Sequence, residues 1–155
     1  MDDKLLDRAV ALSREKMEAG AGGPFGAIVA RDNQIIAEGW NQVTSENDPT
    51  AHAEIVAIRR AAAALGGFDL SGCTLYASTE PCPMCYGAAH WARISRIVYA
   101  NDRHAAAAVG FDDALLHAQL ELPANDRMIE MVHKPREDAL AAMAEWAAKP
   151  DKVPY

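Results

Sequence analysis

Hydrophobic side chains near the N-terminus recur with the period of a helix. Leu5, Ala9 and Leu12 are three or four positions apart, and the pattern stops at the glycines of residues 20–23. The following segment, PFGAIVARDNQIIAEGWNQV, contains two apolar runs on either side of Asp32 and Asn33, which favour a tight turn. The pattern therefore predicts an amphipathic helix followed by a β-hairpin.

The rest of the chain alternates between helical and strand patterns. An alanine-rich helix is predicted to open at residues 48–50 and to end near 66–67, followed by a strand at 74–78, a helix from 81 to 93 and a strand at 96–100. Helical fragments and a loop are predicted between 101 and 125, and a further strand near 128–132. The last predicted element is a helix after 135, with Leu140, Met143 and Trp146 on its apolar side. This order predicts an α/β domain in which helices pack on both faces of one sheet.

Composition narrows the class of protein. The chain has 155 residues, half of them hydrophobic, which suits one globular domain over 1–155. The start MDDKLLDRAV is acidic where a secretory leader is basic, and no apolar run approaches the ~18 residues of a membrane span. A soluble, cytoplasmic protein is predicted. The formal net charge of −7 and the scattered lysines and arginines disfavour a nucleic-acid partner.

A pair of cysteines carries the first chemical signal. Cys82 and Cys85 are two of only three cysteines, and their i, i+3 spacing after Pro81 places both in the first turn of a predicted helix. In a reducing compartment such a pair favours metal binding over a disulfide. A zinc site needs at least one further ligand, and His52 in the segment TAHAE supplies it.

Glu54 turns this metal site into a candidate catalytic centre. Three protein ligands with one open position are typical of catalytic zinc, which makes hydroxide available near neutral pH. Glu54, two residues after His52, serves an ion placed off the helix end and transfers protons. The pair of motifs H-x-E and P-C-x-x-C is the signature of zinc nucleobase deaminases. In the alternative interpretation His52 satisfies a helix end, Glu54 is a solvated surface residue and the cysteines are core residues.

With these motifs the chain resembles the cytidine and deoxycytidylate deaminase superfamily, and within it the small bacterial guanine deaminases. The segments that carry the resemblance are GGPFGAIV, NDPTAHAEIVAIR, EPCPMCYGAAHWAR, AVGFDD and the C-terminal tyrosine. The resemblance covers almost the whole chain. It implies a three-layer α/β/α sandwich with a central mixed sheet, one Zn²⁺ per chain held by His52, Cys82 and Cys85, and a homodimer in which a C-terminal segment, about 135–155, is exchanged between subunits.

The resemblance also implies roles for residues outside the metal motif. It makes Asn41 a hydrogen-bonding partner of a purine base, Phe25 its stacking platform, and Ala53 and Tyr155 further contacts to the base. Asp113 corresponds to a second catalytic acid near the leaving amine. Without the resemblance, Phe25 is a core residue, Asn41 ends a strand and Asp113 is a helix cap. The ending DKVPY departs from the subgroup by its proline, and we expect this proline to alter how Tyr155 enters a site.

The metal motif alone does not select the substrate. Related tRNA adenosine deaminases share DPTAHAEI, but they usually carry a basic C-terminal helix, whereas this chain ends with AAMAEWAAKPDKVPY. We therefore predict hydrolysis of free guanine to xanthine and ammonia. Guanosine, a cytosine-type or triazine base, and tRNA adenosine stay open as alternative substrates, and a non-catalytic domain stabilised by structural zinc is the alternative from another class.

Overall fold

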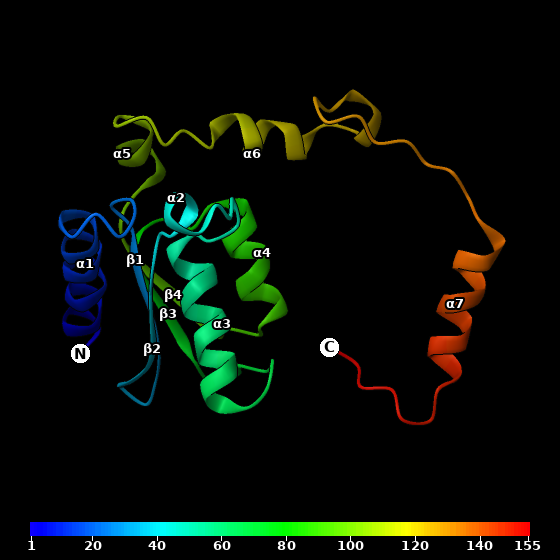
Figure 1. Ribbon diagram of the computed structural model, residues 1–155, viewed down its shortest axis with the longest axis horizontal. Helices are drawn as coiled ribbons and strands as arrows, with labels where there is room; N and C mark the ends of the chain where they lie inside the picture. The colour runs from blue at the N-terminus through cyan, green and yellow to red at the C-terminus, as the bar shows by residue number, and fades with distance from the viewer. The chain divides into compact units, whose positions relative to one another are not determined.

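The computed structural model describes residues 1–155, which divide into two compact units, 1–113 and 114–155. The elements of the first unit are α1 (Asp2–Glu18), β1 (Gly26–Arg31), β2 (Gln34–Trp40), α2 (Val43–Glu46), α3 (Ala53–Leu65), β3 (Thr74–Thr79), α4 (Pro83–Trp91), β4 (Arg96–Asn101) and α5 (Arg103–Ala107) (Figure 1). The helices and strands predicted for this part of the chain are confirmed, with boundary shifts of a few residues. No helix has the length and apolar character that crossing a membrane requires.

One mixed sheet forms the centre of the first unit. Its strand order is β2-β1-β3-β4, with β1 antiparallel to both β2 and β3 and with β4 parallel to β3. The predicted hairpin turn is confirmed, because Asp32 and Asn33 both have positive φ values of 50° and 65°. Such a turn has the twist that joins two antiparallel strands.

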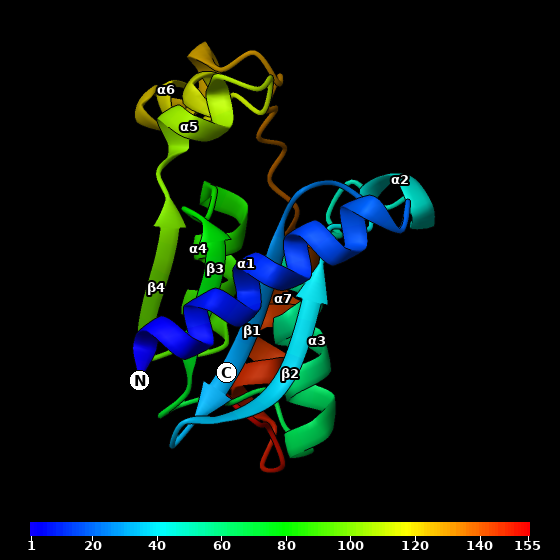
Figure 2. The same ribbon diagram turned by 90° about the vertical axis from the view of Figure 1, so that its left-hand side faces the viewer.

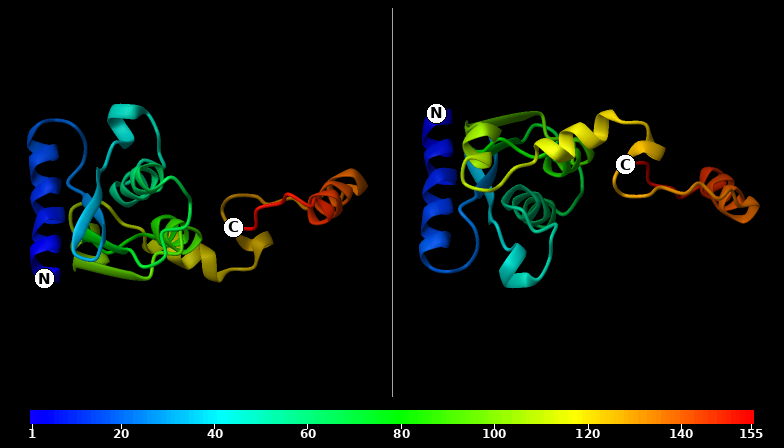
Figure 3. Two further views of the ribbon diagram at one scale, coloured as in Figure 1. Left: turned by 90° about the horizontal axis from the view of Figure 1, so that it is seen from below. Right: turned by 90° about the horizontal axis from the view of Figure 1, so that it is seen from above.

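Helices cover both faces of this sheet. Figures 2 and 3 show α1 on one side of the strands and α3 and α4 on the other. Successive residues of a strand point to opposite faces, so Ile28 packs with Leu5 beneath α1, whereas Val29 packs with Ala57 beneath α3. The result is the predicted three-layer arrangement. This arrangement brings the N-termini of α3 and α4 to the end of the sheet at which β2 terminates.

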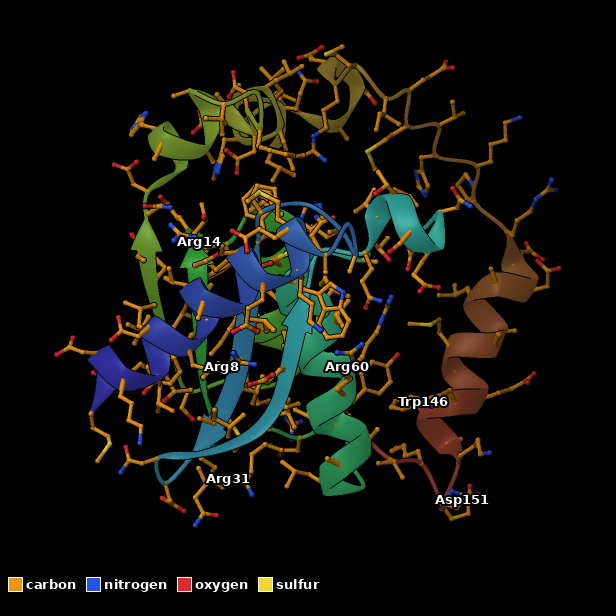
Figure 4. The ribbon with its side chains drawn as sticks, turned by 60° about the vertical axis from the view of Figure 1, so that its left-hand side comes forward. Arg8, Arg14, Arg31, Arg60, Trp146 and Asp151 are labelled. Atoms are coloured by element: carbon orange, nitrogen blue, oxygen red, sulfur yellow. The ribbon has the colours of Figure 1, made fainter.

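The second unit contains α6 (Ala114–Glu121), a short 3-10 helix (Ala124–Asp126) and α7 (Glu137–Ala148). No residue of this unit is buried in the single chain. The predicted C-terminal helix is confirmed as α7, but its apolar residues are exposed: Leu140 by 73%, Met143 by 71% and Trp146, labelled in Figure 4, by 44%. These side chains lack the burial that a globular domain gives to an apolar helix face.

The strand predicted near residues 128–132 is wrong. This segment has no regular secondary structure, and the unit that contains it has no strand with which it forms a ladder. Met128, Ile129 and Val132 have a strand-like composition, but a strand exists only where a neighbour satisfies its backbone hydrogen bonds. Local composition therefore overpredicted a strand here.

Candidate active site

Two helix N-termini bring three metal-ligating side chains together. His52 is the N-cap residue of α3, Cys82 is the N-cap residue of α4, and Cys85 lies buried in the first turn of α4. The His52 Nδ1 atom is 3.6 Å from the Cys82 Sγ atom and 3.5 Å from the Cys85 Sγ atom. All three ligand atoms lie within 4.8 Å of one another. The predicted ligand set therefore converges on one point.

The chemistry of these three residues fits zinc. Two sulfurs and one imidazole nitrogen form a donor set that zinc prefers, and three protein ligands leave one position open. A hydrogen bond from the Cys85 thiol, with a second from His52, lowers the pKa of Cys82 to about 4. The same bond to Cys82, together with burial, raises the pKa of Cys85. The low pKa favours the thiolate form of Cys82, and a zinc ion held by this cluster would require Cys85 to lose its proton as well.

Glu54 is buried beside this cluster and is only 8% exposed. Burial is the main cause that raises the pKa of its carboxyl above the usual range. His52 and Glu54 share one cavity because His52 has an extended backbone, with φ −65° and ψ 156°, and precedes the helix. An ideal helix would have turned the two side chains apart. The structure therefore contradicts the solvated surface position of the alternative interpretation.

A cavity of about 600 Å³ opens over the cluster, and all of its lining residues belong to the first unit. The predicted site residues that line it are Phe25, Asn41, His52, Glu54, Cys82 and Asp113. Cys85 is fully buried and Ala53 is a buried residue in the first turn of α3, and neither lines the cavity. Tyr155 is in the second unit and is 74% exposed.

Asn41 is fixed in this cavity by local hydrogen bonds. Its backbone N–H donates to the carbonyl of Phe25 at 3.1 Å, and its side-chain oxygen accepts from the backbone N–H of Val43 at 3.2 Å. The chain also passes very close at Gly22, where an added Cβ would lie 1.6 Å from the carbonyl oxygen of Asn41. Only glycine allows this approach. The loop before β1 therefore holds the end of β2 in place.

Sequence reasoning missed several residues of the cavity. Phe111 contacts Phe25 edge to face, with ring centroids 4.8 Å apart and an interplanar angle of 89°. Glu80 accepts a hydrogen bond from the backbone N–H of Arg103 at 3.0 Å, and this bond joins the loop before Cys82 to α5. Phe111 belongs to the segment AVGFDD, in which only Asp113 has a predicted role. Glu80 directly precedes the PCPMC motif, and Arg103 has no signal in the sequence.

The fold and the site together define a zinc-binding deaminase. The family model of the cytidine and deoxycytidylate deaminase zinc-binding region matches residues 1–101. The chain belongs to this family.

Individual relatives extend the comparison beyond the zinc region. The chain is 45% identical to guanine deaminase of Bacillus subtilis over 99% of its own length and 98% of that protein's. The solved structure of guanine deaminase from Bacillus subtilis superposes with a TM-score of 0.95 over 99% of this chain and 98% of that one, at 45% identity.

Two further relatives match a smaller part of the chain. A tRNA-specific adenosine deaminase of Haemophilus influenzae is 39% identical over 78% of this chain and 73% of that protein. The solved structure of a mutant of the protein NE0047 in complex with 8-azaguanine superposes with a TM-score of 0.70 over 74% of this chain and 66% of that one, at 36% sequence identity.

Proposed function

We propose that this protein is a zinc-dependent aminohydrolase that converts free guanine to xanthine and ammonia. One observation carries the reaction type: the buried carboxyl of Glu54 shares a cavity with the converging His52, Cys82 and Cys85. A structural zinc site has four protein ligands and no use for such a carboxyl. The identity of 45% to a guanine deaminase over nearly the whole chain supports guanine as the substrate. Reduced cysteine ligands also favour the cytoplasm.

Zinc, when bound by His52, Cys82 and Cys85, supplies the Lewis acidity that makes hydroxide available near neutral pH. The chain's own residues perform the proton transfers. Glu54 takes a proton from the attacking water, whose oxygen bonds to the amine-bearing carbon, and passes that proton to the adjacent ring nitrogen. The proton of the new hydroxyl is then transferred to the amine, the C–N bond breaks, and ammonia leaves as the carbonyl of xanthine forms. A carboxyl whose pKa is raised by burial is suited to both accepting and donating a proton.

The other lining residues hold the base in place. A planar purine stacks on Phe25, whose ring is supported edge to face by Phe111, while the amide of Asn41 hydrogen-bonds to the base. Asp113, in the same cavity, acts near the leaving amine. Ala53 acts through its backbone at the start of α3, because its side chain is buried. These assignments give each residue a contact that does not require a ribose or a nucleic acid.

The experiment that tests this proposal measures ammonia release from zinc-loaded protein with guanine, guanosine, cytosine, adenine and ammeline. We expect guanine to have the highest kcat/KM, because the chain is 45% identical to a guanine deaminase over 99% of its own length. A higher kcat/KM for another compound would reassign the substrate. Absence of turnover with all five would contradict the enzyme assignment.

We further propose that the chain acts as a homodimer whose C-terminal segment, about 135–155, is exchanged between subunits. Many large apolar side chains of the second unit are exposed, including Leu140, Met143 and Trp146, and a helix with such a face needs a partner. Tyr155 lies beyond α7 on a terminal segment that would otherwise fray. Its place at a partner's cavity would cover the bound base and exclude water.

Deletion of residues 153–155 tests the role of Tyr155. We expect the truncated protein to keep its zinc and its dimeric state but to lose at least about tenfold in kcat/KM for guanine, roughly 1.4 kcal/mol of transition-state stabilisation. Steady-state kinetics, metal analysis and light scattering provide the three readouts. The variant Tyr155→Phe separates the ring from the hydroxyl. Unchanged kcat/KM after truncation would remove Tyr155 from the site, and a monomeric full-length protein would also remove the exchange.

A further inference from the structure

Arg60 connects α3 to the end of β2 through three contacts. Its Nη1 atom donates to the carbonyl oxygen of Glu38 at 2.9 Å, and its Nη2 atom donates to the side-chain oxygen of Gln42 at 3.3 Å. Its guanidinium carbon also lies 4.3 Å from the ring centroid of Trp40. Figure 4 labels Arg60 on α3 beside this strand. A planar guanidinium is suited to this combination of stacking and forked hydrogen bonding.

Trp40 receives a second cation from the other side of the sheet. The Nζ atom of Lys16, on α1, lies 4.2 Å from the centroid of its ring. The Trp40 Nε1 atom is buried and has no hydrogen-bond partner, so interactions of its ring rather than of its N–H hold the indole. Cation–π contacts of this kind contribute about 0.5–2 kcal/mol each. Arg60 and Lys16 thus fix the last residue of β2 to both helical layers.

The residues that follow Trp40 enter the active site. Asn41 lines the cavity, and the backbone N–H of Gln42 donates to the carbonyl of Ala51 at 2.9 Å, one residue before His52. The strand also touches α3 directly: a Cβ added to Gly39 would lie 2.3 Å from the carbonyl oxygen of Ala53. The end of β2 and the first turn of α3 are therefore packed directly against each other.

Arg60 stabilises this contact between β2 and α3 from outside the cavity. It does not line the active site but borders a separate hollow of about 370 Å³, together with Gln42 and Arg59. It lies on the same helix as Glu54 and contacts residues on both sides of Asn41. A shift of the strand end relative to α3 would change the spacing between the amide of Asn41 and the carboxyl of Glu54. Such misplacements are costly, since about 1 Å can reduce the rate by about 10²-fold.

We propose that Arg60 is a positioning residue that fixes Asn41 relative to Glu54, and so sets how the base is presented to the group that transfers the proton. This inference rests on the proposed function. It assigns a specific task to an arginine that contacts neither the metal ligands nor the cavity.

A double-mutant cycle tests the inference in zinc-loaded, full-length protein. We expect Arg60→Ala to reduce kcat/KM for guanine by about 10- to 100-fold and to weaken binding of 8-azaguanine, measured by calorimetry, while zinc stoichiometry is unchanged. Arg60→Lys keeps a cation over Trp40 and recovers part of the loss. In an Asn41→Ala background, Arg60→Ala has little further effect, because the group that it positions is already gone. Arg14→Ala, which replaces an exposed arginine of α1, is the control.

A merely structural role for Arg60 predicts a different result. In that case Arg60→Ala lowers kcat/KM by the same factor with and without Asn41, and this outcome overturns the inference. Amide hydrogen exchange supplies a readout that needs no turnover: exchange at Asn41 and Gln42 becomes faster in Arg60→Ala, and unchanged exchange there also overturns the inference. Failure of wild-type protein to deaminate guanine refutes the proposed substrate instead, and the cycle is then run with the base that is turned over.

Discussion

Glu54→Gln is expected to retain zinc and to lose turnover by about 10² to 10⁴-fold. The amide occupies the same volume beside His52, so the zinc ligands and the cavity keep their positions. It cannot take a proton from water or deliver one to the base, so the chemical step fails. The measurement is kcat with guanine on protein whose zinc content has been determined, together with the affinity for 8-azaguanine. We expect that affinity to change much less than kcat, because Glu54 acts on the proton and not on stacking.

Glu46→Gln is the matched control for this experiment. Glu46 is an exposed residue of α2 that does not line the active-site cavity, so the same chemical change there is expected to leave kcat unaltered. Near-normal turnover of Glu54→Gln would contradict the proposed mechanism. Together with full zinc occupancy, that result would favour the structural-zinc alternative and leave the buried carboxyl without a chemical role.

Replacement of a zinc ligand is expected to abolish both metal binding and activity. Cys82→Ala and Cys85→Ala each leave only two protein ligands, and two ligands seldom hold zinc. Metal analysis after exhaustive dialysis gives the zinc content, and ammonia release gives the activity. Zinc binding also stabilises the folded state, because the ligand set is assembled only on folding. The Tm of wild-type protein is therefore expected to fall on chelation, whereas the Tm of either variant does not respond to chelator.

Cys73→Ala separates loss of a ligand from loss of a buried cysteine. Cys73 is fully buried in the core next to β3 and does not belong to the ligand cluster. This variant is expected to keep its zinc and its activity while losing some stability to the small cavity that the substitution creates. Full zinc stoichiometry in both Cys82→Ala and Cys85→Ala would refute the assignment of the ligands.

Local signals in the sequence were sufficient for most of the elements and for the metal ligands. The helical period around Leu5 predicted α1, the turn-forming residues Asp32 and Asn33 marked the hairpin, and Pro81 with the cysteine pair marked the start of α4. These signals work because each element is specified by neighbours within one or two turns of the chain. The strand prediction near 128–132 was wrong for the opposite reason, because a strand needs a partner strand that its own residues do not specify.

The sequence by itself determined which chemical groups are present and which helix ends carry them: an imidazole and a carboxyl at one N-terminus, and two thiols at another. Only the tertiary structure decided that His52 and Glu54 face one cavity, that Phe111 packs against Phe25, and that Arg60 connects α3 to the strand carrying Asn41. The physical reason is that these contacts join segments far apart in the chain. Their geometry follows from how α3 and α4 pack on the sheet, and no periodicity or spacing encodes it directly.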